Sequence, residues 1–226
     1  MLEDIIAITA EYRASVTATD IILLVACLSL WSFVYYEAVL SPRGSPNGFE
    51  KSAFISNLHS VPLCVLAALS IAELTPEAVP VCWSVGFFVV DLVDSVTRRE
   101  LMWTVHAVLS LVLNVATGFV PRHVVLRSRS RGFLTEASTP FLNHWKRLKS
   151  HASFCVFWMA FTACRILWVP YFLHQSYYVK LNGELDAMVY PSLAFYLLQL
   201  AWWVKMCTML VNYKIPEKTK NGKKEE

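Results

Sequence analysis

The chain has 226 residues, of which 56% are hydrophobic and 13% aromatic, and its mean hydropathy is +0.46. This composition is too apolar for an ordinary soluble domain and indicates one integral membrane domain. The net charge is only +3, and the basic residues lie beside apolar segments, so the sequence argues against a nucleic-acid-binding protein.

The N-terminal segment, residues 1–20, begins with acidic residues and lacks the basic region and cleavage site of a signal peptide. We therefore expect the first span, residues 21–40, to remain in the mature protein. Six apolar runs are long enough to cross a bilayer, and they should be helices because backbone groups cannot stay unpaired in lipid. They cover residues 21–40, 53–74, 78–94, 101–120, 153–173 and 187–211.

Residues 133–148 form a possible seventh element. The segment is too short and too polar for a lipid-facing span, so it is either a short helix sheltered by the bundle or an amphipathic helix on the surface. Models with six spans and with seven spans both place most Lys and Arg residues in the cytosol, so charge bias does not choose between them. Both put the basic tail, residues 212–226, in the cytosol.

Arg165 lies inside the apolar run 153–173, which offers no partner for its charge. A guanidinium near the middle of a membrane costs about 3 kcal/mol on insertion scales, so it normally faces protein or trapped water. Glu136 has the same difficulty if residues 133–148 are buried, and an ion pair would relieve both desolvation costs. We predict that Glu136 pairs with Arg165, either as a scaffold or as part of a functional cavity.

Other polar residues of the apolar segments have simpler explanations. Asp94 precedes Arg98 by four residues, the spacing of an interfacial helix pair, whereas Asp91 is deeper and could serve either the interface or a function. His106 is a hydrogen-bonded packing residue or a catalytic group. Residues 127–131 alternate arginine and serine, and this composition suggests a solvated loop.

Six cysteines lie in apolar segments without metal-ligand spacing, so we expect neither a metal site nor a disulfide framework.

Four of these features form a familiar pattern: Asp91 in FFVVDLVD, His106 in TVHAVLSL, Glu136 in TEASTPFLNHW and Arg165 in CRILW. The pattern resembles the TLC domain, a membrane module of translocating-chain-associating proteins, ceramide synthases and the ceroid-lipofuscinosis ER proteins. The resemblance covers residues 52–211, and its most specific element is the E-x-S-T-P-F-L block. It implies an all-α, multi-pass transmembrane bundle of six or seven helices around a polar cavity, working on or near membrane lipids.

The ceramide synthases of this family transfer a fatty acyl group to a sphingoid amine with a histidine pair and a downstream acidic cluster. This sequence departs from that pattern, because Val105 stands where the first histidine would be and the acidic cluster is missing. A single histidine, His106, could still act as an acid or base. The departures argue against the synthase reaction and favour a protein that is not an enzyme.

Lys223 and Lys224 stand fourth and third from the C-terminus, which resembles the dilysine signal that retrieves membrane proteins to the endoplasmic reticulum. We therefore expect an ER protein that binds lipid or regulates membrane lipid composition. Its cavity would be lined by Asp91, His106, Glu136 and Arg165, with the arginine holding a lipid phosphate or carboxylate. The alternatives are an acyltransferase acting on a lipid amine and an ER cargo or assembly factor with membrane-protein clients. No cofactor is expected.

Overall fold

The computed structural model describes residues 16–37, 48–119, 127–175 and 189–212, and their regular structure is entirely helical. The prediction of an all-α fold is therefore confirmed. The elements in chain order are α2 (Ala18–Tyr35), α3 (Gly48–Ile71), α4 (Ala78–Thr97), α5 (Leu101–Gly118), α7 (Ser128–Phe133), η2 (Leu134–Ser138), α8 (Thr139–Leu148), α9 (His151–Phe161), η3 (Thr162–Leu167), α10 (Trp168–Leu173) and α11 (Val189–Val211).

Six helices are long and apolar enough to cross a membrane, as the hydropathy pattern predicts. They begin and end close to the predicted limits, at Ala18–Tyr35, Ser52–Ile71, Ala78–Thr97, Leu101–Gly118, His151–Leu173 and Val189–Val211. The fifth of these joins α9, η3 and α10 into one continuous helix. The multi-pass architecture thus follows directly from the distribution of apolar residues.

The segment that the sequence left ambiguous is sheltered by the bundle. α7, η2 and α8 follow one another without interruption, and all three contact α3. The run at residues 127–131 is not the solvated loop that we expected. Its serines, Ser128 and Ser130, are buried in and beside the first turn of α7, because they pack towards the neighbouring helices.

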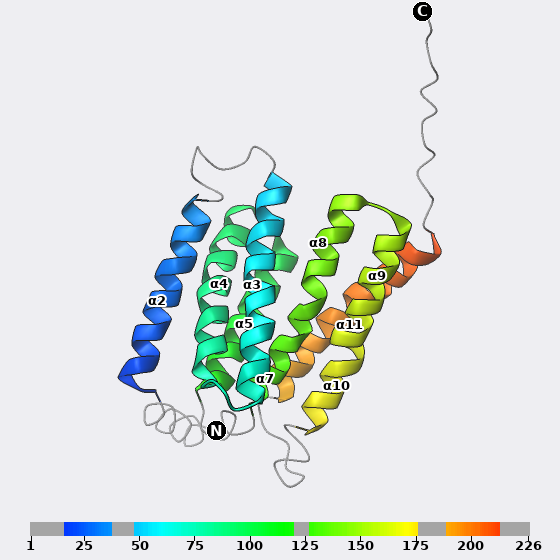
Figure 1. Cartoon of the computed structure of the whole chain (residues 1–226). Coiled ribbons are helices and arrows are strands. Elements are labelled where there is room, and N and C mark those ends of the chain that lie inside the picture. Colours follow the sequence, from blue (N-terminus) through cyan, green and yellow to red (C-terminus); the bar gives the residue numbers. More distant parts are fainter. Residues whose placement is uncertain (1–15, 38–47, 120–126, 176–188, 213–226) are drawn as a thin grey trace, which may run out of the picture.

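The α7–η2–α8 unit runs from one end of the bundle to the other, like the six apolar helices around it (Figure 1). Within the described residues the chain therefore traverses the bundle seven times. The start of α2 and the end of α11 consequently lie at opposite ends (Figure 1). This geometry matches the seven-span alternative and not the six-span one.

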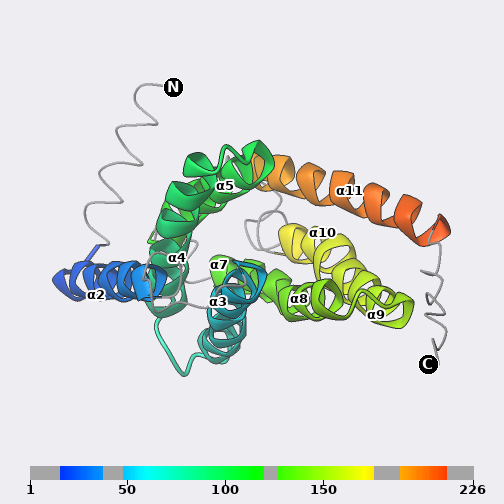
Figure 2. The ribbon, with the colours of Figure 1, turned by 90° about the horizontal axis from the view of Figure 1, so that it is seen from above.

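Seen from above, the helices form two facing rows (Figure 2). One row contains α4, α5 and α11, and the other contains α3, α8 and the α9–α10 helix. Contacts of α3 with α4 and of α9 with α11 join the rows at their two ends. Helix α2 packs on the outside against α4. The two rows therefore enclose a common interior.

Close packing of α2 on α4 depends on Gly86. A Cβ atom at this position would lie 2.8 Å from Cδ1 of Trp31 and 3.0 Å from the backbone carbon and oxygen of Cys27. Small residues allow helices to approach closely in membranes, where lipid supplies no hydrophobic force between them. The contact is held further by Trp31, whose Nε1 donates to the backbone oxygen of Trp83 at 3.0 Å.

We expect Gly86→Ala to destabilise the protein by about 1–3 kcal/mol, because the added methyl group must push α2 away from α4. Thermal unfolding in detergent would measure the loss. Gly132→Ala is the matched control, since its Cβ would meet mainly the flexible guanidinium end of Arg129. Equal melting temperatures of the two variants would contradict the importance of the α2–α4 contact.

Candidate functional site

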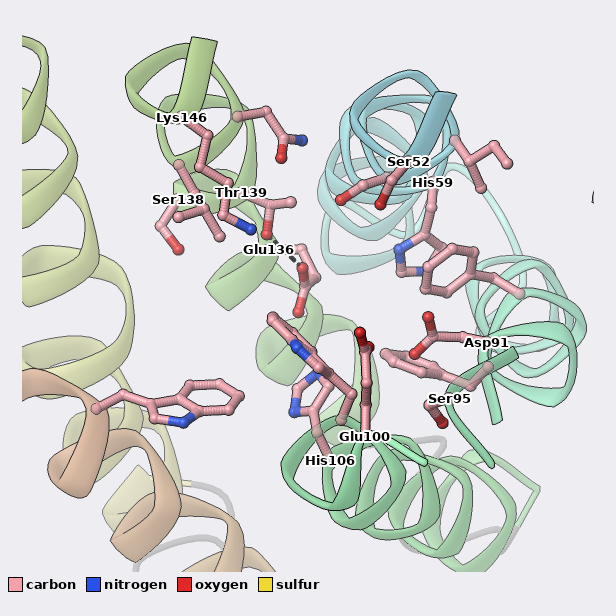
Figure 3. A pocket seen from close by; sticks show the side chains of 18 of the residues that line it. Ser52, His59, Asp91, Ser95, Glu100, His106, Glu136, Ser138, Thr139 and Lys146 are labelled. Atoms are coloured by element: carbon pink, nitrogen blue, oxygen red, sulfur yellow. Dashed lines mark hydrogen bonds between the residues drawn. The ribbon is translucent and has the colours of Figure 1, made fainter. Parts of the chain in front are cut away.

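A cavity of about 660 Å³ lies between the two rows of helices. Its wall mixes charged and hydroxyl-bearing side chains with aromatic ones from α2, α3, α4, α5, α8, the α9–α10 helix and α11. All four residues that the sequence singled out for a polar interior border this one cavity: Asp91, His106, Glu136 and Arg165. Figure 3 shows how three of them, Asp91, His106 and Glu136, extend from different helices into the same space.

Arg165 and Glu136 form the predicted ion pair. Nη2 of Arg165 lies 3.1 Å from Oε1 of Glu136, and both side chains are buried. The same guanidinium donates from Nε to Oγ of Ser138 at 2.9 Å, from Nη1 to Oε1 of Gln199 at 3.0 Å, and from Nη2 to Oγ1 of Thr139 at 3.2 Å. Arg165 therefore joins the α9–α10 helix to η2, α8 and α11.

The charge of this network is balanced within the protein. Oε2 of Glu136 accepts a hydrogen bond from Oγ1 of Thr139 at 2.7 Å, while Oε1 accepts from Arg165. A guanidinium has five N–H donors, and protein groups occupy most of them here. Little of Arg165 is left for the lipid phosphate or carboxylate that we expected it to hold.

The helix that carries Arg165 is locally widened, since η3 is a π-helical segment. Such segments interrupt the regular backbone hydrogen bonds and often occur at functional sites. Pro170 follows one turn later and cannot donate to the carbonyl of Ile166, four residues earlier. The hydroxyl of Tyr196 on α11 donates to that oxygen at 3.2 Å. A neighbouring helix thereby satisfies a carbonyl that would otherwise be unpaired at membrane depth.

His106 is buried, and aromatic rings surround its imidazole. Its ring centroid lies 5.7 Å from that of Phe88, 5.4 Å from that of Phe195 and 5.4 Å from that of Trp202. Nδ1 has no hydrogen-bond partner among the residues that the structure describes. The prediction of a hydrogen-bonded packing residue is therefore wrong for this nitrogen, and aromatic rings surround the imidazole.

Charged side chains gather where α4 ends and α5 begins. Asp94 accepts a hydrogen bond from Nε of Arg98 at 2.8 Å and another from the hydroxyl of Tyr35, so the predicted helix pair is confirmed. Glu100, Lys146 and Lys205 also line the cavity, and Nζ of Lys146 lies 5.6 Å from the ring centroid of Trp103. These residues give the cavity a charged rim.

Several residues that complete the site had no predicted role. Ser138 and Thr139 stand in the E-x-S-T-P-F-L block, and Gln199 interrupts an apolar span, but their bonds to Arg165 join segments far apart in the chain. His59 on α3 is a further buried cavity residue. A polar residue within an apolar span was the available signal for both Gln199 and His59. Lys223 and Lys224 lie outside the described residues.

Comparison with known families identifies the module. The TLC domain model matches residues 21–213 and so includes the first transmembrane helix, upstream of the 52–211 range expected from the motifs. No curated protein and no solved structure was found to match the chain. The matched range spans every helix of the cavity wall from Ile21 onwards. The chain therefore belongs to the TLC domain family of multi-pass membrane proteins.

Proposed function

We propose that this protein binds a membrane lipid in the cavity between its two rows of helices and thereby regulates the lipid composition of the ER membrane. The cavity volume of about 660 Å³ supports this proposal, because it falls in the range of small-molecule sites. The wall also has the two surfaces that a lipid needs. Polar groups surround Glu136, and apolar side chains such as Phe157, Met206 and Met209 offer contact to an acyl chain.

A side chain that fills the cavity should displace the lipid. Ser56 lines the cavity, is half-buried and has no hydrogen bond among the described contacts, so Ser56→Trp adds bulk to the interior without removing a polar contact. We expect protein purified in mild detergent to carry lipid visible by native mass spectrometry, and the variant to lose most of it.

Val65→Trp on the same helix is the matched control, since Val65 is 56% exposed and does not line the cavity. It adds the same indole to the lipid-facing side and should retain lipid like the unaltered protein. Equal lipid retention by both variants would contradict binding in this cavity, provided that both proteins elute as folded species.

The acyltransferase alternative uses the same cavity with His106 as an acid or base. Its support is the unpartnered Nδ1 of His106, which lines the cavity together with Glu136. Lipidomics separates the two proposals. An enzyme should lose its lipid product to the same extent in cells lacking the protein and in cells expressing His106→Ala, whereas a lipid binder keeps the rest of its cavity and should show a weaker effect with the alanine than without the protein. Unchanged lipids with retained client proteins would favour an escort factor.

Residence in the ER and a cytosolic C-terminus are part of the proposal. Lys146, Arg147 and Lys149 lie at the end of α8, at the same end of the bundle as the end of α11 (Figure 1). Basic residues favour the cytosolic side, so this end should face the cytosol together with the tail. Replacing Lys223 and Lys224 by serine should release a tagged protein from the ER, and unchanged ER residence would remove the argument from the tail.

A further inference from the structure

We infer that the polar end of the cavity receives a lipid headgroup that carries hydroxyl groups and no charge, held between His59 and His106. The inference rests on the proposed function and names the chemical class of the lipid. It depends on two buried imidazoles that approach one cavity from facing rows of helices, His59 from α3 and His106 from α5 (Figures 2 and 3).

Both imidazoles are buried, with exposed fractions of 2% for His59 and 6% for His106. Nε2 of His59 and Nδ1 of His106 have no hydrogen-bond partner among the described residues. Buried polar atoms in proteins are nearly always hydrogen-bonded, because an unpaired one costs about 1–3 kcal/mol. Two such atoms bordering one cavity therefore point to a ligand that supplies the missing bonds.

Aromatic contacts hold the ring of His59 in place, while its Nε2 has no hydrogen-bond partner among the described residues. The ring stacks on Phe87 with centroids 3.8 Å apart and planes 10° from parallel, and Phe88 meets its edge at 5.3 Å. The backbone is fixed as well, since Nε1 of Trp83 donates to the carbonyl oxygen of His59 at 3.2 Å. Phe88 also contacts the ring of His106, so the two imidazoles share one aromatic neighbour.

The neighbouring groups select the chemistry of the ligand. Asp91 and Glu136 extend into the same space (Figure 3), and the oxygen atoms of a carboxyl group accept hydrogen bonds. A neutral imidazole offers one donor and one acceptor. A hydroxyl group both donates and accepts, so it can satisfy carboxylates and imidazoles together.

Charged headgroups fit this set less well. A phosphate only accepts hydrogen bonds and would face the carboxyl groups of Asp91 and Glu136. Lys146 and Lys205 also line the cavity, but Nζ of Lys146 lies over the ring of Trp103, and most donors of Arg165 already bind protein groups. An ammonium group only donates, so it can pair with an imidazole nitrogen only in the tautomer in which that nitrogen accepts, whereas a hydroxyl group can pair with either tautomer. Two imidazoles on facing helices suit two hydroxyls of one headgroup, as in a glycerol that carries a single acyl chain.

Photo-crosslinking tests this inference with a monoacylglycerol that carries a diazirine in its acyl chain. The purified full-length protein is labelled, the modified peptides are mapped, and unlabelled lipids of equal chain length compete. The competitors are monooleoylglycerol, methyl oleate, oleoyl lysophosphatidate and oleylamine. We expect the labels to map to cavity residues. Monooleoylglycerol should compete at a concentration about tenfold lower than the other lipids, because a tenfold difference in affinity corresponds to about one hydrogen bond.

His59→Phe and His106→Phe keep a ring in place and remove the hydrogen-bonding atoms, so each should abolish the preference for monooleoylglycerol. His144→Phe is the matched control, because His144 is exposed and does not line the cavity. The competition series on the unaltered protein gives the answer even if a variant fails to fold.

The outcomes separate this inference from the proposed function. Cavity labelling with equal competition by all four lipids, or with the lysophosphatidate or the amine as best competitor, would overturn the hydroxyl headgroup and leave lipid binding intact. Labels that map only to lipid-facing residues would remove both.

Discussion

Glu136→Ala is expected to destabilise the protein by about 3–5 kcal/mol, because it leaves the buried guanidinium of Arg165 without its counter-charge. In a chain of this size such a loss lowers the melting temperature by roughly 10 °C. The variant should also give less folded protein on fluorescence-detected size exclusion after heating. Arg165→Leu should be equally damaging, since it leaves the carboxylate of Glu136 buried and unpaired.

Exchanging the two charges tests whether direct pairing is the cause. Glu136→Arg combined with Arg165→Glu should recover much of the stability lost in either single variant. The amide of Gln199 can assist, because its Nε2 is buried without a partner and can turn towards a carboxylate at position 165. A double variant no more stable than the single ones would show that the two residues act separately.

An apolar pair separates the structural role of the ion pair from its role in binding. Glu136→Leu with Arg165→Met removes both charges together, and such replacements of buried ion pairs are often neutral for stability. We expect this variant to fold and to retain less lipid in native mass spectrometry, because the polar end of the cavity is lost. Normal lipid retention would assign the pair to the scaffold alone.

Glu77→Ala is expected to lower the free energy of unfolding by about 2–4 kcal/mol, although Glu77 does not line the cavity and belongs to no recognised motif. Its carboxylate is 1% exposed and ties three segments together. Oε1 accepts from the backbone nitrogen of Ser130 at 2.8 Å, and Oε2 accepts from the hydroxyl of Ser70 at 2.7 Å and from that of Ser130. Without the carboxylate these donors stay buried and unpaired.

Thermal melting of two glutamine variants provides the matched comparison. Glu77→Gln keeps one acceptor oxygen but brings an amide nitrogen against a hydroxyl donor, so it should lose part of the stability. Glu73→Gln makes the same change at an exposed position four residues earlier and should melt like the unaltered protein. Equal melting of Glu77→Gln and Glu73→Gln would show that Glu77 does not anchor α7.

The anchor at Glu77 and the network at Arg165 together place the α7–η2–α8 unit inside the bundle. Glu77 binds Ser130 at the start of the unit, and Arg165 binds Ser138 and Thr139 near its middle. The unit carries Glu136 between these two attachments. We expect loss of either attachment to disturb the cavity, since the position of Glu136 depends on both.

The sequence by itself determined the six apolar helices and the partner of Arg165. Hydropathy is a local property, so the length of an apolar run defines a span without knowledge of its neighbours. The pairing with Glu136 was predictable for a related reason. A buried guanidinium must find an acid, and Glu136 lay in a polar segment that could be buried in the bundle.

The tertiary structure decided what depends on residues far apart in the chain. It turned residues 127–148 into a seventh traverse, because serines and Glu136 that look solvent-accessible in sequence find buried partners on α3, α4 and the α9–α10 helix. It also brought His59 to the cavity of His106. No local pattern encodes that meeting, since it follows from how the two rows of helices pack.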